Sequence, residues 1–228
     1  IKDLSPGEIK MILDTAKSYK ELVLRPIKKV PTLRGKTVVL LFCEPSTRTR
    51  ISFELSAKRL SADVINVSKD SSSLAKGESL VDTAKNFESL KINTIVVRHK
   101  CAGAPALLAE SLNASVINAG DGYHEHPTQC LLDMYTILDK KKTFKGLKVA
   151  IVGDILHSRV ARSNIWGLTK MGASVTVCAP PSMIPRDIEK LGVNVSYDLK
   201  EAIREVDVIN LLRIQFERHS GILFPSIR

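Results

Sequence analysis

Hydroxyl-bearing and basic side chains alternate in one short segment, Ser46-Thr47-Arg48-Thr49-Arg50. A run of apolar residues precedes it, and a helical pattern starts within it with Ser46 as a natural N-cap. Backbone N–H groups at a helix N-terminus carry partial positive charge and attract anions. Because the hydroxyl and guanidinium groups add further donors, the segment predicts a phosphate site. An ordinary capped helix with surface arginines is the alternative, but it accounts for Ser46 alone.

Two other segments could add donors to such a site. The Ser-rich stretch at 71–78 contains Ser72, Ser73 and Lys76 and ends where a helix is predicted to start. By composition alone it is typical of a solvent-facing linker. Arg98 stands at the end of a predicted strand, and ligands bind parallel sheets beyond the carboxyl ends of the strands. Arg98 is therefore a candidate ligand residue, although a salt bridge is the commoner role at such a position.

A segment rich in polar residues, D-G-Y-H-E-H-P-T-Q, runs from Asp121 to Gln129. His124 and His126 flank Glu125, which could suggest a metal site. Alternating residues on a loop, without further Cys or His ligands, make a poor case for one, so we expect no metal. A core or capping histidine is the other ordinary interpretation of His126.

The second half of the chain offers arginines and lacks a nucleotide motif. A predicted strand ends at Gly153, but no G-x-G-x-x-G follows, so no dinucleotide site is predicted. Arg159 then stands at the start of a helix, and Arg213 and Gln215 follow a later strand. Two guanidinium forks suit a ligand that carries two carboxylates.

These candidates need a scaffold, and short apolar strands alternate with helical patterns almost from end to end. This alternation predicts an α/β fold with parallel sheets covered on both faces. The expected strands are 37–43, 64–67, 94–98, 116–118, 147–152, 174–178 and 208–212. The expected helices are 5–20, 46–60, 78–90, 105–112, 127–138, 158–171 and 199–205. The first of them has a Ser cap, a Pro and then Glu8, which is a good start signal.

The alternation pauses once, at the polar and basic stretch 139–146. This pause predicts two doubly wound parallel-sheet domains, 1–138 and 139–228, with a cleft between them and the helix 127–138 as the connection.

Composition limits the class of protein. The chain has 228 residues, 44% of them hydrophobic and 25% charged, which is ordinary for a soluble globular protein. It shows no apolar run of membrane-spanning length and no signal core, and its four cysteines are scattered, so we expect a cytoplasmic protein without disulfides. The net charge of +10 allows nucleic-acid binding or binding of small anions. Nucleic acid would call for a clustered basic stripe with aromatics, and neither is evident, so we expect none.

The motif S-T-R-T-R at 46–50, with H-P-T-Q at 126–129, resembles the signature of the aspartate/ornithine carbamoyltransferase family. The resemblance implies that 1–138 binds carbamoyl phosphate, with His126 donating to the carbamoyl oxygen and Gln129 holding the carbamoyl amide. The carbamoyl phosphate ligands it implies are Ser46, Thr47, Arg48, Thr49, Ser72, Arg98, His126 and Gln129. Ser73 stays an alternative to Ser72, and Arg50 is expected to be structural.

The second domain indicates which branch of the family applies. G-D-x-x-x-x-R at 153–159 and R-x-Q-x-E-R at 213–218 resemble the aspartate branch, with Phe216 where many members carry Lys. The ornithine branch's D-x-x-x-S-M segment is not evident. The resemblance therefore implies carbamoyl transfer to the α-amine of L-aspartate in de novo pyrimidine biosynthesis, sequentially, without a covalent intermediate, cofactor or metal. The implied aspartate ligands are Lys76, Arg159, Arg213 and Gln215, and the implied catalytic residues are Arg48, Thr49, Lys76, Arg98 and His126.

The same resemblance implies a homotrimer in which a neighbouring subunit contributes Lys76 to a shared active site. It is compatible with regulatory or other pyrimidine-pathway subunits. The family's later H-P-x-P-R loop is missing from the sequence, so we expect the domain 139–228 to be C-terminally incomplete. A non-catalytic carbamoyl phosphate-binding or assembly subunit is the rival interpretation. Retention of Arg159, Arg213 and Gln215 argues against it, because a protein that only binds carbamoyl phosphate needs no aspartate clamp.

Overall fold

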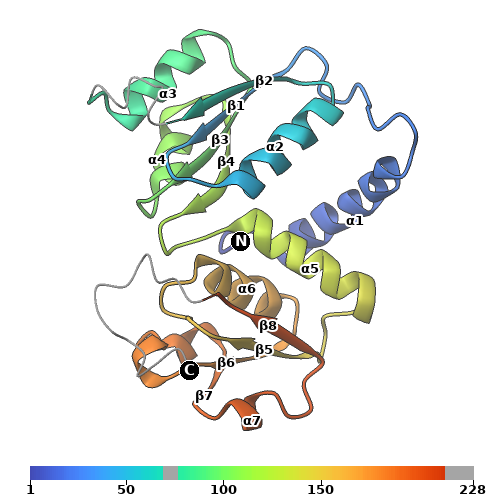
Figure 1. The fold of residues 1–228 in the computed structure, drawn as a ribbon, viewed down its shortest axis with the longest axis vertical. Coiled ribbons are helices and arrows are strands. Elements are labelled where there is room, and N and C mark those ends of the chain that lie inside the picture. The colour runs from blue at the N-terminus through green and yellow to red at the C-terminus, as the bar shows by residue number, and fades with distance from the viewer. Residues whose placement is uncertain (69–76, 214–228) are drawn as a thin grey trace. The chain divides into compact units, whose positions relative to one another are not determined.

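The computed structural model describes residues 1–68 and 77–213 and contains two four-stranded parallel sheets (Figure 1). Residues 14–128 form one compact unit, called the N-terminal unit below. Residues 1–13 and the chain from 129 onward form the other, the C-terminal unit. The predicted α/β class with two parallel-sheet domains is confirmed, whereas the boundary after residue 138 stays a prediction.

The sheet of the N-terminal unit has the strand order β2-β1-β3-β4. Its strands are β1 (Thr37–Phe42), β2 (Asp63–Ser68), β3 (Thr94–His99) and β4 (Ser115–Asp121). The helices that follow its first three strands are α2 (Thr47–Arg59), α3 (Leu80–Ser89) and α4 (Ala104–Ser111).

Helices cover both faces of this sheet because successive strand residues point to opposite sides. Leu40 of β1 is buried in one cluster with Ala57 of α2. Its neighbour Leu41 is buried in another cluster with Ala84 of α3 and Leu108 of α4. Figure 1 shows α2 on one side of the sheet and α3 and α4 on the other. The continuous apolar run of β1 therefore reflects burial on both faces.

The sheet of the C-terminal unit has the order β7-β6-β5-β8. Its strands are β5 (Lys148–Val152), β6 (Ser174–Cys178), β7 (Asn194–Ser196) and β8 (Val208–Leu211). The helical elements associated with it are α5 (Pro127–Lys141), α6 (Arg159–Lys170), α7 (Leu199–Ala202) and the 3₁₀ turns η3 (Pro181–Met183) and η4 (Ile188–Leu191).

The chain opens with α1 (Pro6–Val23), whose first residues belong to the C-terminal unit. Ser5 and Glu8 form the expected reciprocal cap, because Ser5 N donates to Glu8 Oε2 at 2.8 Å and Glu8 N donates to Ser5 Oγ at 3.2 Å. The hydrogen bond from the Ser5 backbone, followed by that from its hydroxyl, holds the pKa of Glu8 below its usual value. Ile9 and Leu13 then bury their side chains in the core of the C-terminal unit.

The structure differs from the predicted elements at several places. Helix α5, predicted to end at residue 138, continues to Lys141, into the stretch 139–146 that we expected to separate the two domains. Lysines in a last helical turn interact favourably with the helix dipole, so a basic run does not end a helix. The three-residue strand β7 was not predicted, and α7 ends at Ala202 instead of residue 205. Within 1–68 and 77–213, no helix combines the length and apolar character needed to cross a membrane.

Candidate active site

The strand order brings the predicted residues of the N-terminal unit to one edge of its sheet. From β1 the chain moves outward to β2 and then returns to β3 on the other side of β1. The carboxyl ends of β1 and β3 therefore flank the point where the order reverses, which is where ligands bind in open α/β sheets. The loop after β1 carries Ser46, β3 carries Arg98 near its end, and the loop after the neighbouring β4 carries His126.

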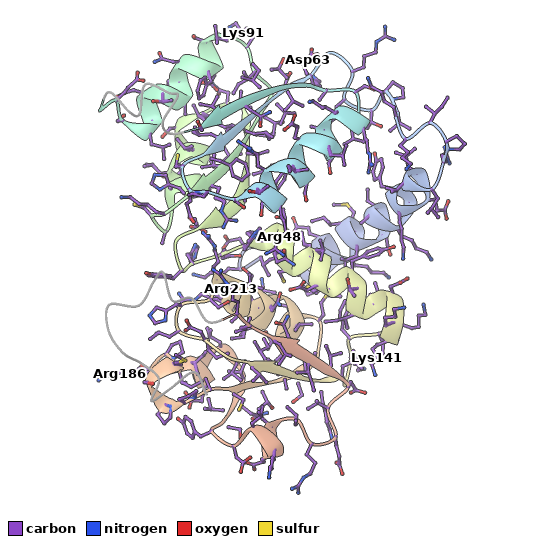
Figure 2. All side chains as sticks on the ribbon, in the orientation of Figure 1. Arg48, Asp63, Lys91, Lys141, Arg186 and Arg213 are labelled. Atoms are coloured by element: carbon purple, nitrogen blue, oxygen red, sulfur yellow. The ribbon has the colours of Figure 1, made fainter. Side chains whose placement is uncertain are left out.

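Ser46 occupies the N-cap position of α2, as predicted, but its side chain makes no capping hydrogen bond. Thr47 and Arg48 are exposed in the first turn, where Figure 2 labels Arg48, and that turn holds no acidic residue. Hydroxyl, guanidinium and helix-end N–H groups are thus close together in a turn that contains no carboxylate of its own. This arrangement suits an anionic ligand.

Arg98, in β3, contacts groups of α2, of β4 and of the loop before α5. Its Nη1 atom lies 3.4 Å from Thr49 Oγ1, 3.2 Å from the Ala119 carbonyl oxygen and 3.5 Å from His126 Nε2. Its Nε atom lies 3.8 Å from Glu44 Oε1. We call Glu44, Thr49, Arg98 and His126 the Arg98 cluster. It contains three of the predicted residues. Its fourth member, Glu44, lies two positions before Ser46 and was not among the predicted residues.

The histidine of this cluster is buried, with 7% of its surface exposed. A guanidinium group can only donate hydrogen bonds, so a contact with Arg98 requires His126 Nε2 to act as the acceptor. The ring proton then resides on Nδ1.

A buried carboxylate shapes the loop that leads to His126. Asp121 is 1% exposed and accepts hydrogen bonds from the backbone N–H groups of Gly103 at 2.7 Å and Glu125 at 3.0 Å. It also accepts from the Asn118 amide at 2.8 Å and lies 3.0 Å from His124 Nδ1. A carboxylate before Gly commonly organises a turn in this way. His124 thus helps to hold the loop, and no group of three or more potential metal ligands occurs among the described residues.

Gln129 lies in the first turn of α5 and belongs to the C-terminal unit. Its Nε2 donates to Asp133 Oδ1 at 2.8 Å. Four other residues singled out from the sequence, Ser72, Ser73, Lys76 and Gln215, lie outside the described residues, and so does Phe216.

In the C-terminal unit the two candidate arginines also flank a reversal of strand order. Strand β8 pairs with β5 on the side opposite β6, so the carboxyl ends of β5 and β8 lie next to each other. A Cβ added to Gly153, just after β5, would lie 2.9 Å from the Leu212 carbonyl oxygen, which shows how closely the two ends approach. Arg159 begins α6 and is only 3% exposed, whereas Arg213, labelled in Figure 2, is exposed just beyond β8.

The loop from β5 to α6 is held by residues that were not among the predicted site residues. Asp154, fully buried, accepts a hydrogen bond from His157 N at 3.1 Å and lies 2.9 Å from His157 Nδ1. Ser158 then caps α6 by accepting from Ala161 N at 3.1 Å. These contacts fix the start of α6 and with it the backbone of Arg159.

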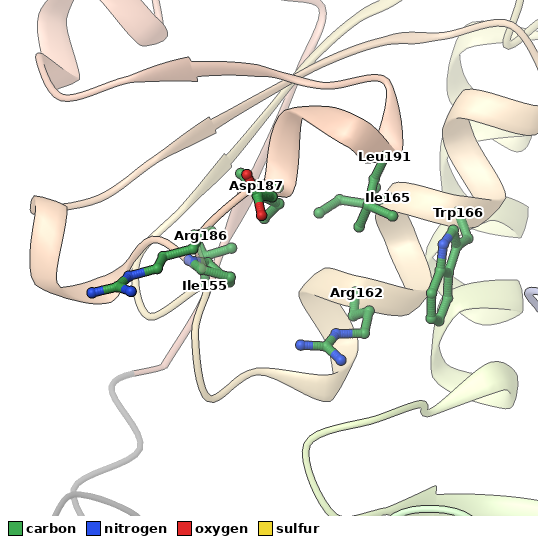
Figure 3. A pocket seen from close by; sticks show the side chains of 9 residues that line it. Ile155, Arg162, Ile165, Trp166, Arg186, Asp187 and Leu191 are labelled. Carbon is green, nitrogen blue, oxygen red and sulfur yellow. The ribbon is translucent and has the colours of Figure 1, made fainter.

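A cavity of about 200 Å³ lies elsewhere in the C-terminal unit, between α6 and the segment 185–191 (Figure 3). Ile155, Ile165 and Trp166 form part of its wall, with Arg162 and Arg186 also lining it. None of the predicted site residues within 1–68 and 77–213 lines this cavity, so we place neither substrate there.

Comparison with known proteins bears on this arrangement. Residues 1–139 match the family model "Aspartate/ornithine carbamoyltransferase, carbamoyl-P binding domain", and residues 145–220 match "Aspartate/ornithine carbamoyltransferase, Asp/Orn binding domain". The chain is 61% identical to the aspartate carbamoyltransferase catalytic subunit of Endomicrobium trichonymphae, covering 100% of this chain and 73% of the relative. It is also 61% identical to that of Moorella thermoacetica, over 100% and 74%.

Solved structures agree with the sequence matches. Aspartate transcarbamoylase from Trypanosoma cruzi in complex with carbamoyl phosphate superposes with a TM-score of 0.87 at 29% identity, covering 96% of this chain and 72% of that one. Ornithine carbamoyltransferase from Pyrococcus furiosus superposes with a TM-score of 0.84 at 32% identity, covering 96% and 72%. With both sheets, both family models and relatives at this identity in agreement, the chain belongs to the aspartate/ornithine carbamoyltransferase family.

Proposed function

We propose that this chain transfers the carbamoyl group of carbamoyl phosphate to the α-amine of L-aspartate, giving N-carbamoyl-L-aspartate and phosphate in de novo pyrimidine biosynthesis. The observation that carries the proposal is the Arg98 cluster, in which Thr49 and His126 meet one guanidinium group beside the open N-terminus of α2. The two catalytic subunits that are 61% identical to this chain support the choice of aspartate as the acceptor.

Carbamoyl phosphate is a dianion that places its phosphate group at the N-terminus of α2. Ser46, Thr47 and Arg48 supply hydroxyl, backbone and guanidinium donors to the phosphate oxygens, and the helix dipole adds to their attraction. The family resemblance assigns Ser72 and Lys76 to the same ligand, where Ser72 adds a hydroxyl donor and Lys76 adds positive charge.

The reaction needs no covalent bond to the enzyme. The lone pair of the neutral aspartate amine attacks the carbamoyl carbon, and the electron pair of the C=O bond moves to its oxygen. Arg98, His126 and Thr49 stabilise that oxyanion, and removal of one such donor commonly lowers the rate by about 10²–10³-fold. When the C=O bond re-forms, the bond to phosphate breaks and the pair leaves with the phosphate oxygen. The departing phosphate accepts the proton that the new amide nitrogen loses.

The ring proton of His126 determines how it can take part. While Nε2 accepts from Arg98, the proton on Nδ1 is the one that the ring can donate. A neutral donor stabilises charge on the carbamoyl oxygen without protonating the attacking amine, and that amine must keep its lone pair.

Aspartate is oriented by its two carboxylates. Arg159 and Arg213 offer bidentate guanidinium forks, with Gln215 and Lys76 assisting. Ornithine would bring a cationic side chain to these arginines and be repelled. Holding two reactants in position can remove about 7–11 kcal/mol of a barrier in favourable intramolecular models.

The assembly proposed for this activity is a cytoplasmic homotrimer whose active sites are shared between subunits. Regulatory subunits or other proteins of the pyrimidine pathway are its proposed partners. Mixing Lys76→Ala chains with Arg48→Ala chains tests the shared site, because hybrid trimers regain active sites that neither parent contains. If the mixture stays inactive while each parent still forms trimers, the shared site is excluded.

The activity is tested by incubating the protein with carbamoyl phosphate and either L-aspartate or L-ornithine. We expect carbamoyl-aspartate and equimolar phosphate, with no citrulline above background. Citrulline would contradict the choice of acceptor. Tight carbamoyl phosphate binding without either product would favour the rival, a binding or assembly subunit.

A further inference from the structure

The carboxylate of Asp133, on α5, lies between two side-chain amides. Gln129 Nε2 donates to Asp133 Oδ1 at 2.8 Å, and Asn164 Nδ2, from α6, donates to Asp133 Oδ2 at 2.9 Å. An ionised carboxylate accepts hydrogen bonds and cannot donate them. Both amides must therefore turn their NH₂ groups toward Asp133, which fixes the orientation of each.

This orientation determines what Gln129 can offer a ligand. The nitrogen and oxygen of a side-chain amide are the two branches of one planar group, so directing Nε2 to Asp133 directs Oε1 away from it. Gln129 consequently presents an acceptor. A carbamoyl group carries an NH₂ group that needs acceptors, whereas an acetyl group carries a methyl group in its place.

Asn164 holds Asp133 in place, although one of its own polar atoms is left in an unfavourable environment. It is only 1% exposed, and its Oδ1 has no hydrogen-bond partner within the described part of the chain. A buried amide oxygen without a donor is unfavourable, so the hydrogen bonds of Asn164 do not by themselves explain why an amide lies here. Its Nδ2 hydrogen bond connects α6 to the carboxylate on α5.

The close packing of α5 against α6 supports the same connection. Cys130 Sγ lies 3.2 Å from the Ser163 carbonyl oxygen, and Gly167 is so close to α5 that an added Cβ would lie 2.7 Å from both Cys130 Sγ and Met134 Sδ. Side chains between helices packed at this distance have little freedom to rearrange. Asp133 is therefore held by its surroundings as well as by Asn164.

A plain helix-stabilising role is the simpler explanation of the contact between Gln129 and Asp133, because these residues are spaced i,i+4 on one helix. That role would not require a buried amide from α6 on the second carboxylate oxygen. It also predicts that loss of Asp133 would affect all ligands of the site alike.

We propose that Asp133 is a positioning residue that turns Gln129 Oε1 toward the carbamoyl nitrogen and thereby makes the chain prefer carbamoyl phosphate to acyl phosphates. The inference rests on the proposed function, since it assumes that Gln129 contacts the carbamoyl group. Asp133 itself touches no substrate.

The test compares dissociation constants for carbamoyl phosphate and acetyl phosphate in the full chain and in Asp133→Asn, a nearly isosteric change that lets either amide reverse. We expect the constant for carbamoyl phosphate to rise about tenfold, the effect of one misdirected hydrogen bond. The constant for acetyl phosphate should stay within about twofold of its original value, because the methyl group never used Oε1. Asp139→Asn, on an exposed site of the same helix, is the matched control and should change neither.

Equal weakening of both ligands, or no change in either, overturns the positioning role while leaving the proposed function intact. Failure of the unmodified protein to bind carbamoyl phosphate overturns both. If Asp133→Asn folds poorly, Asn164→Asp provides a second route, because a carboxylate there repels Asp133 and should reduce the same preference.

Discussion

The two sheets carry their candidate residues at equivalent places, yet the residues differ in how they are held. In the N-terminal unit, Arg98 already contacts Thr49 and His126. In the C-terminal unit, Arg159 is buried at the start of α6 and Arg213 is exposed beyond β8. Residues that share one guanidinium group are energetically coupled, whereas we expect two arginines on different elements, one buried and one exposed, to contribute more independently. The comparison therefore predicts that the carbamoyl phosphate residues of the N-terminal unit act as one coupled site, called the phosphate-side site below. The aspartate residues of the C-terminal unit, called the acceptor side, should act more independently.

The largest expected effect comes from Arg48→Ala. Loss of a charge-assisted donor to a phosphate dianion should raise the dissociation constant of carbamoyl phosphate by about 10²-fold. Arg50→Ala is a close control, since Arg50 is an exposed arginine two residues further along the same helix. Calorimetric titration of both variants checks the result, and similar losses in the two would remove the special role of Arg48.

The next effect should appear on the acceptor side alone. Arg213→Ala removes one of two proposed carboxylate forks, so the KM for aspartate should rise about 50-fold while the KM for carbamoyl phosphate changes by less than about threefold. Steady-state kinetics with each substrate varied in turn measure both values. Arg204→Ala, another exposed arginine of the same unit, should leave both unchanged. An unaltered aspartate KM in Arg213→Ala would rule out this arginine as a ligand.

Two glycines allow the units to be disturbed separately. Gly122 has φ of +50°, and an added Cβ would lie 2.9 Å from the Ala102 nitrogen and the Lys100 carbonyl oxygen, so Gly122→Ala should displace the loop before His126. Gly167→Ala instead forces α6 against α5 and should lower the free energy of unfolding by about 1–3 kcal/mol. We expect Gly122→Ala to weaken carbamoyl phosphate binding about tenfold, and more than Gly167→Ala does. Denaturant titration measures the stability of both variants, and calorimetry measures their carbamoyl phosphate binding. Weaker binding in Gly167→Ala than in Gly122→Ala would contradict the comparison.

The smallest effect concerns cysteines near the carboxyl ends of two strands. Cys101, shortly after β3, is exposed, whereas Cys178, the last residue of β6, is buried. Burial raises the pKa of the Cys178 thiol, and the negative charges of Asp198 and Glu201 raise it further. A raised pKa means less reactive thiolate at any given pH. Thiol labelling between pH 7 and 9 should therefore modify Cys101 first, and Cys101→Ser should abolish the fast phase. Faster labelling of Cys178 would contradict the burial of that strand end.

Much of the fold could be predicted because buried strands have a simple signature. The apolar run of β1 indicated a strand covered on both faces, and the structure has it at Thr37–Phe42. The strand β7 was not predicted because three residues are too few to show an alternating pattern. The end of α5 was missed because the basic residues at 140–141 suit a helix terminus as well as a loop.

The part of the candidate site that lies at the ends of strands could be predicted from the sequence. Thr49 follows β1, His126 follows β4, and Arg98 lies near the end of β3 between them, so their meeting follows from the topology. Asp121 and Asp133 could not be identified in this way, because their importance depends on partners such as Gly103 and Asn164 that lie far away in sequence.

The measurement that tests the central claim most directly is a double-mutant cycle on carbamoyl phosphate binding with Arg98→Ala, His126→Ala and the combined variant. Because Arg98 and His126 belong to one contacting cluster, the combined variant should lose little more binding free energy than Arg98→Ala alone, leaving a coupling energy of at least about 1 kcal/mol. If the two losses instead add to within about 0.5 kcal/mol, the residues act independently and the phosphate-side site is not one assembled unit.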